Sequence, residues 1–298
     1  MTTLNDMGEE AIVHALTLNL STNEALLIGA GDDCAVVQKN EHWDELLKTD
    51  CIVQDIHFTP DTLPHLIGRK ALARALSDIA AMGGRPIHAL ITIFAHGDMD
   101  GNILLGAYEG INQLAQKWGV SIAGGETSSL PQPGFIINVC LTGIIPHGQA
   151  ILRSTARQGD LIAVTGQLGG SFSSGHHLTF IPRIREAELL RQHGLPTSMM
   201  DLSDGLGIDL SRLAKASHLG FHLNSSRIPC RKGCSIQQSL GDGEDYELLF
   251  TLSPDRRNEL KAIEQTLDTP ITIIGTMENQ QNDHPFTGWQ HFTSSPRH

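Results

Sequence analysis

Apolar residues recur at intervals of three and four along several long segments, a spacing that predicts amphipathic helices. The clearest segment is residues 68–82, GRKALARALSDIAAM, where Ala and Leu share one face and the following GGRP ends the helix. Residues 100–118 and the opening residues 5–20 show the same spacing. We therefore expect these three segments to be the helices of the first half of the chain.

Shorter apolar runs lie between the helices and predict buried strands. In the first half these are residues 34–37, 45–58, 88–94, 120–123 and 135–145. In the second half, predicted strands at 161–165, 198–202, 220–223 and 270–274 alternate with predicted helices at 184–193, 207–217 and 256–267. Both halves are thus predicted to be mixed α/β (α+β) layers.

The texture of the chain changes near residue 147, where the segment PHGQAILRSTARQGD is polar and rich in turn residues. A length of 298 residues allows one large domain or two of ordinary size. We therefore predict an N-terminal domain of residues 1–147 and a C-terminal domain of residues 148–298.

The composition narrows the functions that are open to the chain. Its 21 Lys and Arg against 33 Asp and Glu give a net charge of −12, which argues against a nucleic-acid partner. No apolar run approaches the roughly 20 residues of a membrane helix, and the start MTTLNDMGEE has no signal sequence. We expect a cytoplasmic protein with no membrane partner, in which all five cysteines are structural.

Seven acidic residues stand in short motifs that are flanked by Gly or Ser and bounded by apolar residues. They are Asp33, Asp50, Asp78, Glu126, Asp201, Asp204 and Glu244. Carboxylates beside buried elements are costly unless a counter-charge offsets them. Their hard oxygen ligands suit Mg²⁺, which usually bridges to substrate phosphates. The pattern therefore predicts Mg²⁺-dependent phosphate chemistry.

Simpler structural explanations remain open for these motifs. Asp33 fits an Asx turn, whereas Asp201 and Asp204 fit a strand that ends in a helix N-cap. Asp78 is harder to explain, because Asp is a poor residue for the middle of an apolar helix. The chain has no P-loop, protein-kinase motif or G-x-S-x-G elbow, so phosphate chemistry would need another scaffold.

Nine motifs, taken in order, resemble those of the thiamine-monophosphate kinases, a family in the superfamily of aminoimidazole ribonucleotide synthetase. They are GDDCAVV, TD followed by HF, GRKALA, LSDIAAMGGRP, GGET, ILRSTARQGD, DLSDGL, GEDYELLF and GWQHF, spread from about residue 29 to residue 292. Each string is weak alone, but their number and order make the resemblance specific.

The resemblance implies a two-domain fold like that of aminoimidazole ribonucleotide synthetase. The N-terminal sheets of two subunits would pair into an intersubunit barrel, and ATP would bind between this half and a C-terminal α/β domain. The implied reaction transfers the γ-phosphoryl group of ATP directly onto thiamine monophosphate, with several Mg²⁺ ions and no covalent enzyme intermediate. The implied partners are ATP, thiamine monophosphate and a second copy of the chain.

The resemblance also implies roles for individual residues, matched position by position. The metal-binding positions would be Asp33, Thr49, Asp50, Asp78, Glu126, Asp201 and Asp204. The ATP-binding positions would be Tyr108, Gly125, Glu126, Arg153 and Ser203. The positions around the thiamine substrate would be His57, Glu244 and Trp289, with the indole of Trp289 against the cationic ring. Without the family, His57 would be a strand histidine and Trp289 an anchor for the C-terminus.

This chain departs from the usual motifs of that family at four places. Lys48 stands where Ser is common, and Glu126 stands where Asp is common. Residues 241–245 carry an added acid, and residues 171–187 form a shorter segment that contains two adjacent histidines. These departures leave open a related ATP-dependent enzyme for another small phosphorylated molecule. A non-catalytic nucleotide sensor is less well supported, because all seven positions remain acidic.

Overall fold

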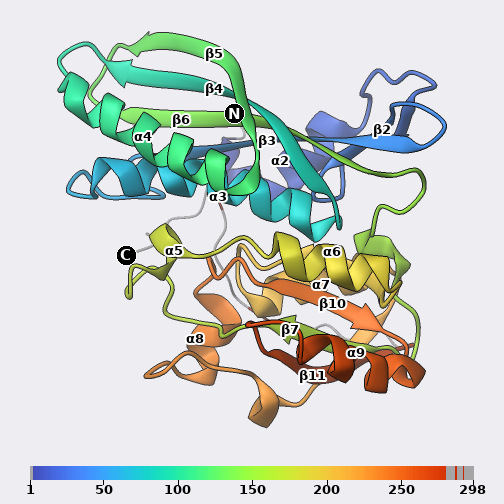
Figure 1. Cartoon of the computed structure of the whole chain (residues 1–298). Coiled ribbons are helices and arrows are strands. Elements are labelled where there is room, and N and C mark those ends of the chain that lie inside the picture. Colours follow the sequence, from blue (N-terminus) through green and yellow to red (C-terminus); the bar gives the residue numbers. More distant parts are fainter. Residues whose placement is uncertain (1–2, 280–285, 287–290, 292–298) are drawn as a thin grey trace.

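The computed structural model describes residues 3–279 together with Phe286 and His291. Two sheets, each with its own helices, are stacked one above the other, the N-terminal sheet in the upper half and the C-terminal sheet in the lower half of Figure 1. Trp289, which the sequence resemblance places at the substrate, lies outside the described residues.

The N-terminal half is a six-stranded sheet in the order β1-β2-β3-β6-β4-β5. All neighbouring strands are antiparallel except β4 and β5, which are parallel and joined by helix α4. Helix α3 packs on β3 and β6 and carries α4 beside it. The elements are β1 (Leu26–Ile28), β2 (Ala35–Gln38), β3 (Trp43–Val53), α3 (Pro64–Ala81), β4 (Arg85–His96), α4 (Gly101–Trp118), β5 (Ser121–Leu130) and β6 (Phe135–Pro146).

Strand β1 was not among the predicted elements, and three predicted elements of this half differ most from the structure. The predicted opening helix is divided at Gly8 into α1 (Leu4–Met7) and α2 (Glu9–Thr17). Strand β3 ends at Val53 rather than at residue 58. Strand β5 does not end at the Gly-Gly pair but continues to Leu130. At Gly125 the two strands come so close that a Cβ would lie 1.8 Å from the carbonyl oxygen of Ile91. Glycine here permits the close backbone approach that strand pairing requires.

The C-terminal half is a five-stranded antiparallel sheet in the order β8-β10-β7-β11-β9. Two elements were not predicted: strand β10, which is the buried segment LLFTL, and the short helix α8. The elements are η1 (Arg153–Thr155), β7 (Leu161–Thr165), α5 (His176–Thr179), α6 (Ile184–Gln192), β8 (Pro196–Asp201), α7 (Leu206–Ala216), β9 (Gly220–Leu223), η2 (Ser225–Arg227), α8 (Ile236–Gly241), β10 (Leu248–Leu252), η3 (Pro254–Arg256), α9 (Arg257–Glu264) and β11 (Ile271–Glu278).

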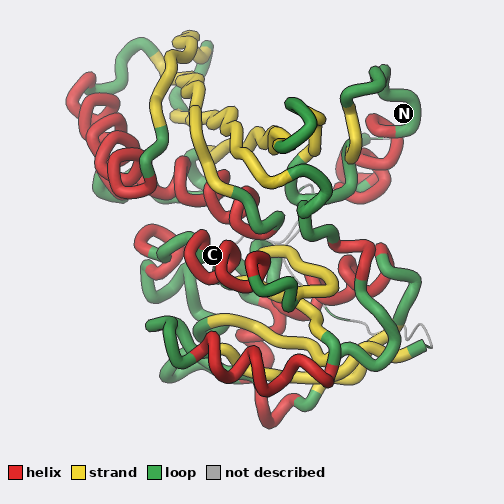
Figure 2. Tube along the Cα trace, turned by 45° about the vertical axis from the view of Figure 1, so that its right-hand side comes forward, coloured by secondary structure: helices red, strands yellow, loops and turns green. Residues whose placement is uncertain are grey.

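Helix α3 lies between the two sheets and is buried on nearly all sides (Figures 1 and 2). A single cluster of buried apolar residues includes Leu76 of α3, Leu190 of α6 and Phe250 of β10. The two halves therefore share this cluster, which surrounds α3, whereas a second cluster that includes Leu210 and Leu249 lies within the C-terminal half. None of the described helices is both long and apolar enough to span a membrane.

Candidate functional site

Three carboxylates from distant parts of the chain meet where the two halves join. Asp33 follows β1, Asp78 lies in the last turn of α3, and Asp201 ends β8. One oxygen from each lies within 4.8 Å of the others, and all three residues are buried. Three hard oxygen donors at this spacing fit a divalent cation such as Mg²⁺. We name Asp33, Asp78 and Asp201 the carboxylate triad.

Basic side chains contact two members of the triad and a nearby acid. The guanidinium of Arg153 lies 2.5 Å from Asp33, Lys48 Nζ lies 2.7 Å from Asp78, and Arg74 Nε lies 3.1 Å from Asp50. The counter-charge that the sequence analysis assigned to Mg²⁺ is thus supplied in part by bases from distant segments of the chain. Each of these carboxylates thus already has a positive partner within the protein.

Burial and the charges of neighbouring carboxylates raise the pKa values of two members of the triad, Asp78 and Asp201. Burial, followed by the charge of Asp33, raises the pKa of Asp201 to about 7. Burial also raises the pKa of Asp78, although Lys48 acts in the opposite direction. A bound cation would favour the ionised form of both groups, because an opposite charge at short range stabilises a carboxylate. Cation binding at Asp78 and Asp201 would therefore release protons.

The simpler explanation of Asp204 as a helix N-cap does not hold in the structure. The N-cap of α7 is Gly205, which makes no side-chain hydrogen bond, while Asp204 lies 2.5 Å from Arg212. The carboxylate of Asp209 instead accepts hydrogen bonds from the backbone N–H groups of Ser203 (3.0 Å) and Asp204 (2.9 Å). Asp209 was not among the predicted residues, although its place in the first turn of α7 is typical of an acid that stabilises a helix start.

The predicted metal position Thr49 faces away from α3. Lys48 and Asp50 reach residues of α3, whereas Thr49 donates a hydrogen bond of 3.2 Å to Asn138 of β6. This alternation follows from strand geometry, in which successive side chains point to opposite faces. The side chain of Thr49 is therefore not brought to the carboxylate triad.

A second group of predicted residues lies along β5. Tyr108, Gly125 and Glu126 line a cavity of about 480 Å³ beside α4. Glu126 is exposed, and its carboxylate accepts a 3.0 Å hydrogen bond from the backbone N–H of Thr127. The structure thus brings together three of the predicted ATP contacts and leaves Glu126 outside the triad.

The predicted substrate residues His57 and Glu244 meet around a buried lysine. Lys70 of α3 has no exposed side-chain surface, and its ammonium donates to Glu244 (2.5 Å) and to the carbonyl oxygen of His57 (2.6 Å). The same ammonium lies 2.8 Å from Nδ1 of His177. Sequence reasoning did not single out Lys70 or assign a role to His177; a lysine on the apolar face of GRKALA was the available signal.

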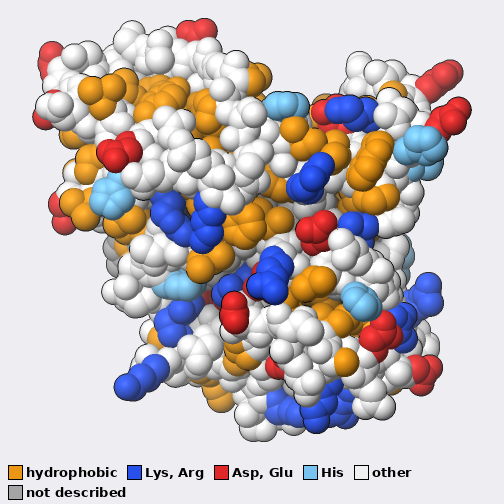
Figure 3. Space-filling model, viewed as in Figure 1, with side chains coloured by type: hydrophobic (Ala, Val, Ile, Leu, Met, Phe, Trp, Pro, Cys, Tyr) orange, Lys and Arg blue, Asp and Glu red, His pale blue; other side chains and the backbone are white. Residues whose placement is uncertain are grey.

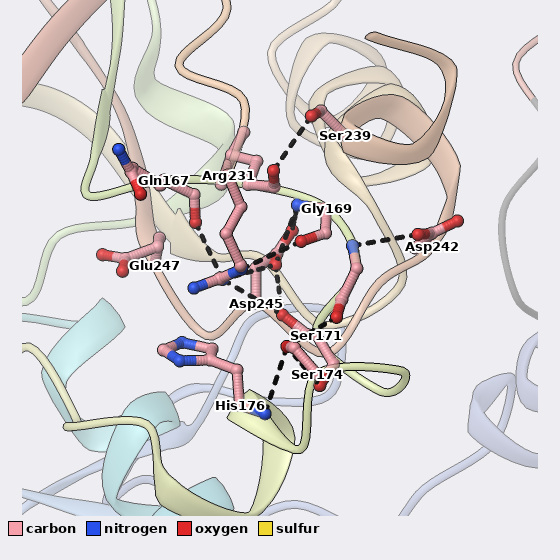
Figure 4. Close-up of polar contacts among 12 residues, drawn as sticks. Gln167, Gly169, Ser171, Ser174, His176, Arg231, Ser239, Asp242, Asp245 and Glu247 are labelled. Carbon is pink, nitrogen blue, oxygen red and sulfur yellow. Dashed lines mark hydrogen bonds and ion pairs between the residues drawn. The ribbon is translucent and has the colours of Figure 1, made fainter. Parts of the chain in front are cut away.

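A network of hydrogen bonds holds the loop that carries Glu244 (Figure 4). The carboxylate of Asp245 accepts from the backbone N–H of Gly169 at 2.9 Å and contacts the hydroxyl of Ser171 and the guanidinium of Arg231. Burial nevertheless raises the pKa of Asp245 to about 6. These hydrogen bonds join the loop before β10 to the Gly-rich loop after β7. They hold Glu244 at the junction of the two halves.

Comparisons with known proteins define the class to which this fold and site belong. The family models for AIR synthase related protein match residues 31–145 with the N-terminal domain and residues 161–286 with the C-terminal domain. A thiamine-monophosphate kinase from Rhodopirellula baltica is 34% identical over 83% of this chain and 82% of its own length. The chain therefore belongs to the thiamine-monophosphate kinase family.

Solved structures agree in fold over nearly the whole chain. AaThiL complexed with AMPPCP and TMP is 26% identical, covers 98% of this chain and 99% of its own, and has a TM-score of 0.84. The thiamine-monophosphate kinase from Stenotrophomonas maltophilia is 28% identical, covers 91% of this chain and 93% of its own, and has a TM-score of 0.74. The predicted two-domain fold is thus confirmed.

Proposed function

We propose that the chain transfers the γ-phosphoryl group of ATP to the phosphate of thiamine monophosphate, which yields thiamine diphosphate and ADP. A phosphate oxygen of thiamine monophosphate forms the new P–O bond, and the bond between the γ-phosphorus and the β,γ-bridging oxygen breaks in line with it. The observation that carries this proposal is the carboxylate triad, which joins Asp33 and Asp78 of one half to Asp201 of the other.

Mg²⁺ is the cation that this donor set suits. We propose that the triad and Asp50 hold it, with Asp204 as a further ligand on the side of α7. When bound, Mg²⁺ neutralises the phosphate charge that develops during transfer. We assign Arg153, which contacts Asp33, to the phosphates of ATP near the triad, together with Ser203, two residues beyond Asp201.

The nucleotide and the acceptor are assigned to separate regions. We place ATP along Tyr108, Gly125 and Glu126, which share one cavity. Thiamine monophosphate is assigned to the side of His57 and Glu244, with Trp289 as its stacking partner. Because Lys70 already offsets the charge of Glu244, we infer that Glu244 contributes hydrogen bonding and shape more than net charge to the recognition of a cationic ring.

A homodimer through the N-terminal sheet completes the proposal. Hydrophobic side chains gather over the region where β4, β5 and β6 lie (Figure 3). On the face of this sheet that is turned away from α3, Leu47 and Leu90 are 41% and 50% exposed, and Cys51 and Cys140 are exposed as well. We name these four residues the open face. Pairing two such faces would bury them in an intersubunit barrel.

A cytoplasmic location is part of the same proposal. All five cysteines are free thiols in the structure, among them the exposed Cys51 and Cys140. Free thiols suit a reducing compartment, where disulfides are rare.

The test is ADP release by the purified full-length chain with ATP and Mg²⁺. Thiamine monophosphate is compared with thiamine, with other small phosphates and with a reaction that lacks an acceptor. Turnover only with thiamine monophosphate supports the proposal. Turnover of another phosphorylated molecule but not of thiamine monophosphate would favour the related enzyme that the departures at Lys48 and residues 171–187 leave open.

A further inference from the structure

Lys48 is the one departure from the family motifs that touches the carboxylate triad in the described residues. Its Nζ atom lies 2.7 Å from Oδ1 of Asp78, with 22% of the Lys48 side chain and 10% of the Asp78 side chain exposed. The ion pair joins β3 to the last turn of α3, and Arg74 of the same helix pairs with Asp50 of the same strand. Lys48 is therefore held against the triad from one side.

The ammonium of Lys48 is committed to Asp78 rather than to Asp50. Asp50, two residues further along the same strand, pairs with Arg74 at 3.1 Å. A lysine ammonium is charged at neutral pH, and its close contact with the carboxylate of Asp78 favours the charged form.

A count of formal charges shows how the ammonium of Lys48 changes the net charge of the triad. The ionised triad carries −3, and Arg153 and Lys48, which contact Asp33 and Asp78, offset two of these charges and leave −1. With Lys48 removed, the same count leaves −2, which one divalent cation would match. A fixed positive charge close to a cation site weakens cation binding there through direct repulsion.

We propose that Lys48 is a built-in cation of the triad that competes with divalent cations for Asp78. This inference rests on the proposed Mg²⁺-dependent function. In the absence of nucleotide, Lys48 offsets the charge of Asp78 and keeps divalent-cation affinity low. The phosphates of ATP add negative charge, so that cations bind tightly together with the nucleotide.

The test is Mn²⁺ binding to the full-length chain without nucleotide. Binding is measured through the electron paramagnetic resonance signal of the Mn²⁺ that remains free. We expect Lys48→Ser and Lys48→Gln to bind Mn²⁺ roughly tenfold or more tightly than the wild type, because repulsion at short range is removed. Lys48→Arg keeps the charge and should bind as the wild type does. Lys39→Ser is the matched control, because Lys39 pairs with Glu45 at 3.4 Å on the exposed side of the same sheet.

A second measurement separates the inference from loss of fold. The melting temperature in EDTA should be lower for Lys48→Gln than for the wild type, since Asp78 loses its partner, and added Mn²⁺ should raise it further than in the wild type. Equal Mn²⁺ affinity in the wild type and in either charge-removing variant would overturn the inference. Turnover of thiamine monophosphate by the wild type tests the proposed function separately.

Discussion

Asp201 differs from the other two members of the triad in its contacts. Among the described residues it accepts a hydrogen bond of 2.6 Å from the hydroxyl of Ser77 and forms no ion pair, whereas Asp33 and Asp78 each contact a base. A carboxylate that is buried with only a neutral donor is costly for stability, and a bound cation would offset this cost. A substitution that removes the charge of Asp201 should therefore lower activity without lowering stability.

We predict that Asp201→Asn lowers kcat by about 10²-fold or more, the scale of losing one preorganised electrostatic contact. Its melting temperature in EDTA should equal or exceed that of the wild type, because the amide removes a buried charge whose pKa is already raised to about 7. Steady-state ADP release and thermal unfolding measure the two effects. Asp44→Asn is the control for a buried acid away from the triad, since Asp44 pairs with His147. Full activity of Asp201→Asn would contradict the metal assignment.

The sequence motifs identified the triad but not the residues that surround it. Asp33, Asp78 and Asp201 each stand in a recognisable string, so their importance could be predicted without coordinates. The contacts of Lys70 with His177 and Glu244 span 107 and 174 positions, and no local pattern encodes a pairing over that distance. Asp209 was missed because the motif DLSDGL drew attention to Asp201 and Asp204, whereas Asp209 stands beyond it in the first turn of α7.

At the scale of elements, the close crossing of α3 and α4 depends on two glycines. A Cβ on Gly68 would lie 1.8 Å from the carbonyl oxygen of Ala107, and one on Gly110 would lie 1.9 Å from that of His65. The backbones of the two helices therefore touch without intervening side chains. Helix α3 carries Asp78 and Lys70, so this crossing also sets the position of both of these side chains.

We predict that Gly68→Ala destabilises the protein by about 1–3 kcal/mol, the usual cost of overpacking. Gly101→Ala is the control, because a Cβ at Gly101 in the first turn of α4 meets nothing within 4 Å. Urea unfolding of both variants gives the comparison. A Gly68→Ala protein as stable as the wild type would show that the helices separate at little cost.

Helices and buried strands with a clear period were predicted well, and the errors have local causes. Strands β7 and β9 have the predicted bounds. The end of strand β5 was predicted too early, because its later residues, GGETSSL, are mostly exposed and lack the apolar pattern of a strand. Strand β10 follows directly after the acidic motif that carries Glu244, so its apolar residues were assigned to the motif rather than to an element.

At the scale of the whole molecule, several buried carboxyls share one direction of pKa shift. Burial raises the pKa of Asp32 and Asp245 to about 6 and that of Asp201 and Asp209 to about 7, from a value of 3.8. The folded state therefore binds more protons than the unfolded state between these values. The stability that these groups contribute is present at low pH and is lost as pH rises through their folded pKa values.

We predict that the melting temperature in EDTA falls between about pH 5 and pH 8. Mg²⁺ should raise the melting temperature more at the upper end of this range, because it binds the ionised carboxylates. Differential scanning fluorimetry across this pH range, with and without Mg²⁺, tests both statements. A melting temperature in EDTA that rises with pH over this interval would contradict the assigned shifts.

The proposed dimer gives a prediction at the same scale. Light scattering over a dilution series should report about twice the 32.3 kDa mass of the chain. Leu90→Glu, in the middle of the open face, should shift the mass toward that of one chain, because a charge is costly in a buried interface. Leu105→Glu is the control, since Leu105 is 69% exposed on α4 and outside the open face. An unchanged mass for Leu90→Glu would place the interface elsewhere.

The core that passes through α3 has a consequence for how the chain could be divided. Leu76 of α3 packs in the same apolar cluster as Leu190 and Phe250, which belong to the other half. A cut near residue 147 would leave each piece with its own sheet but would expose the apolar surface that the other piece covers. The two halves therefore resemble the subunits of an obligate complex joined in one chain. If they were expressed as separate fragments, each would need the other to cover its apolar surface.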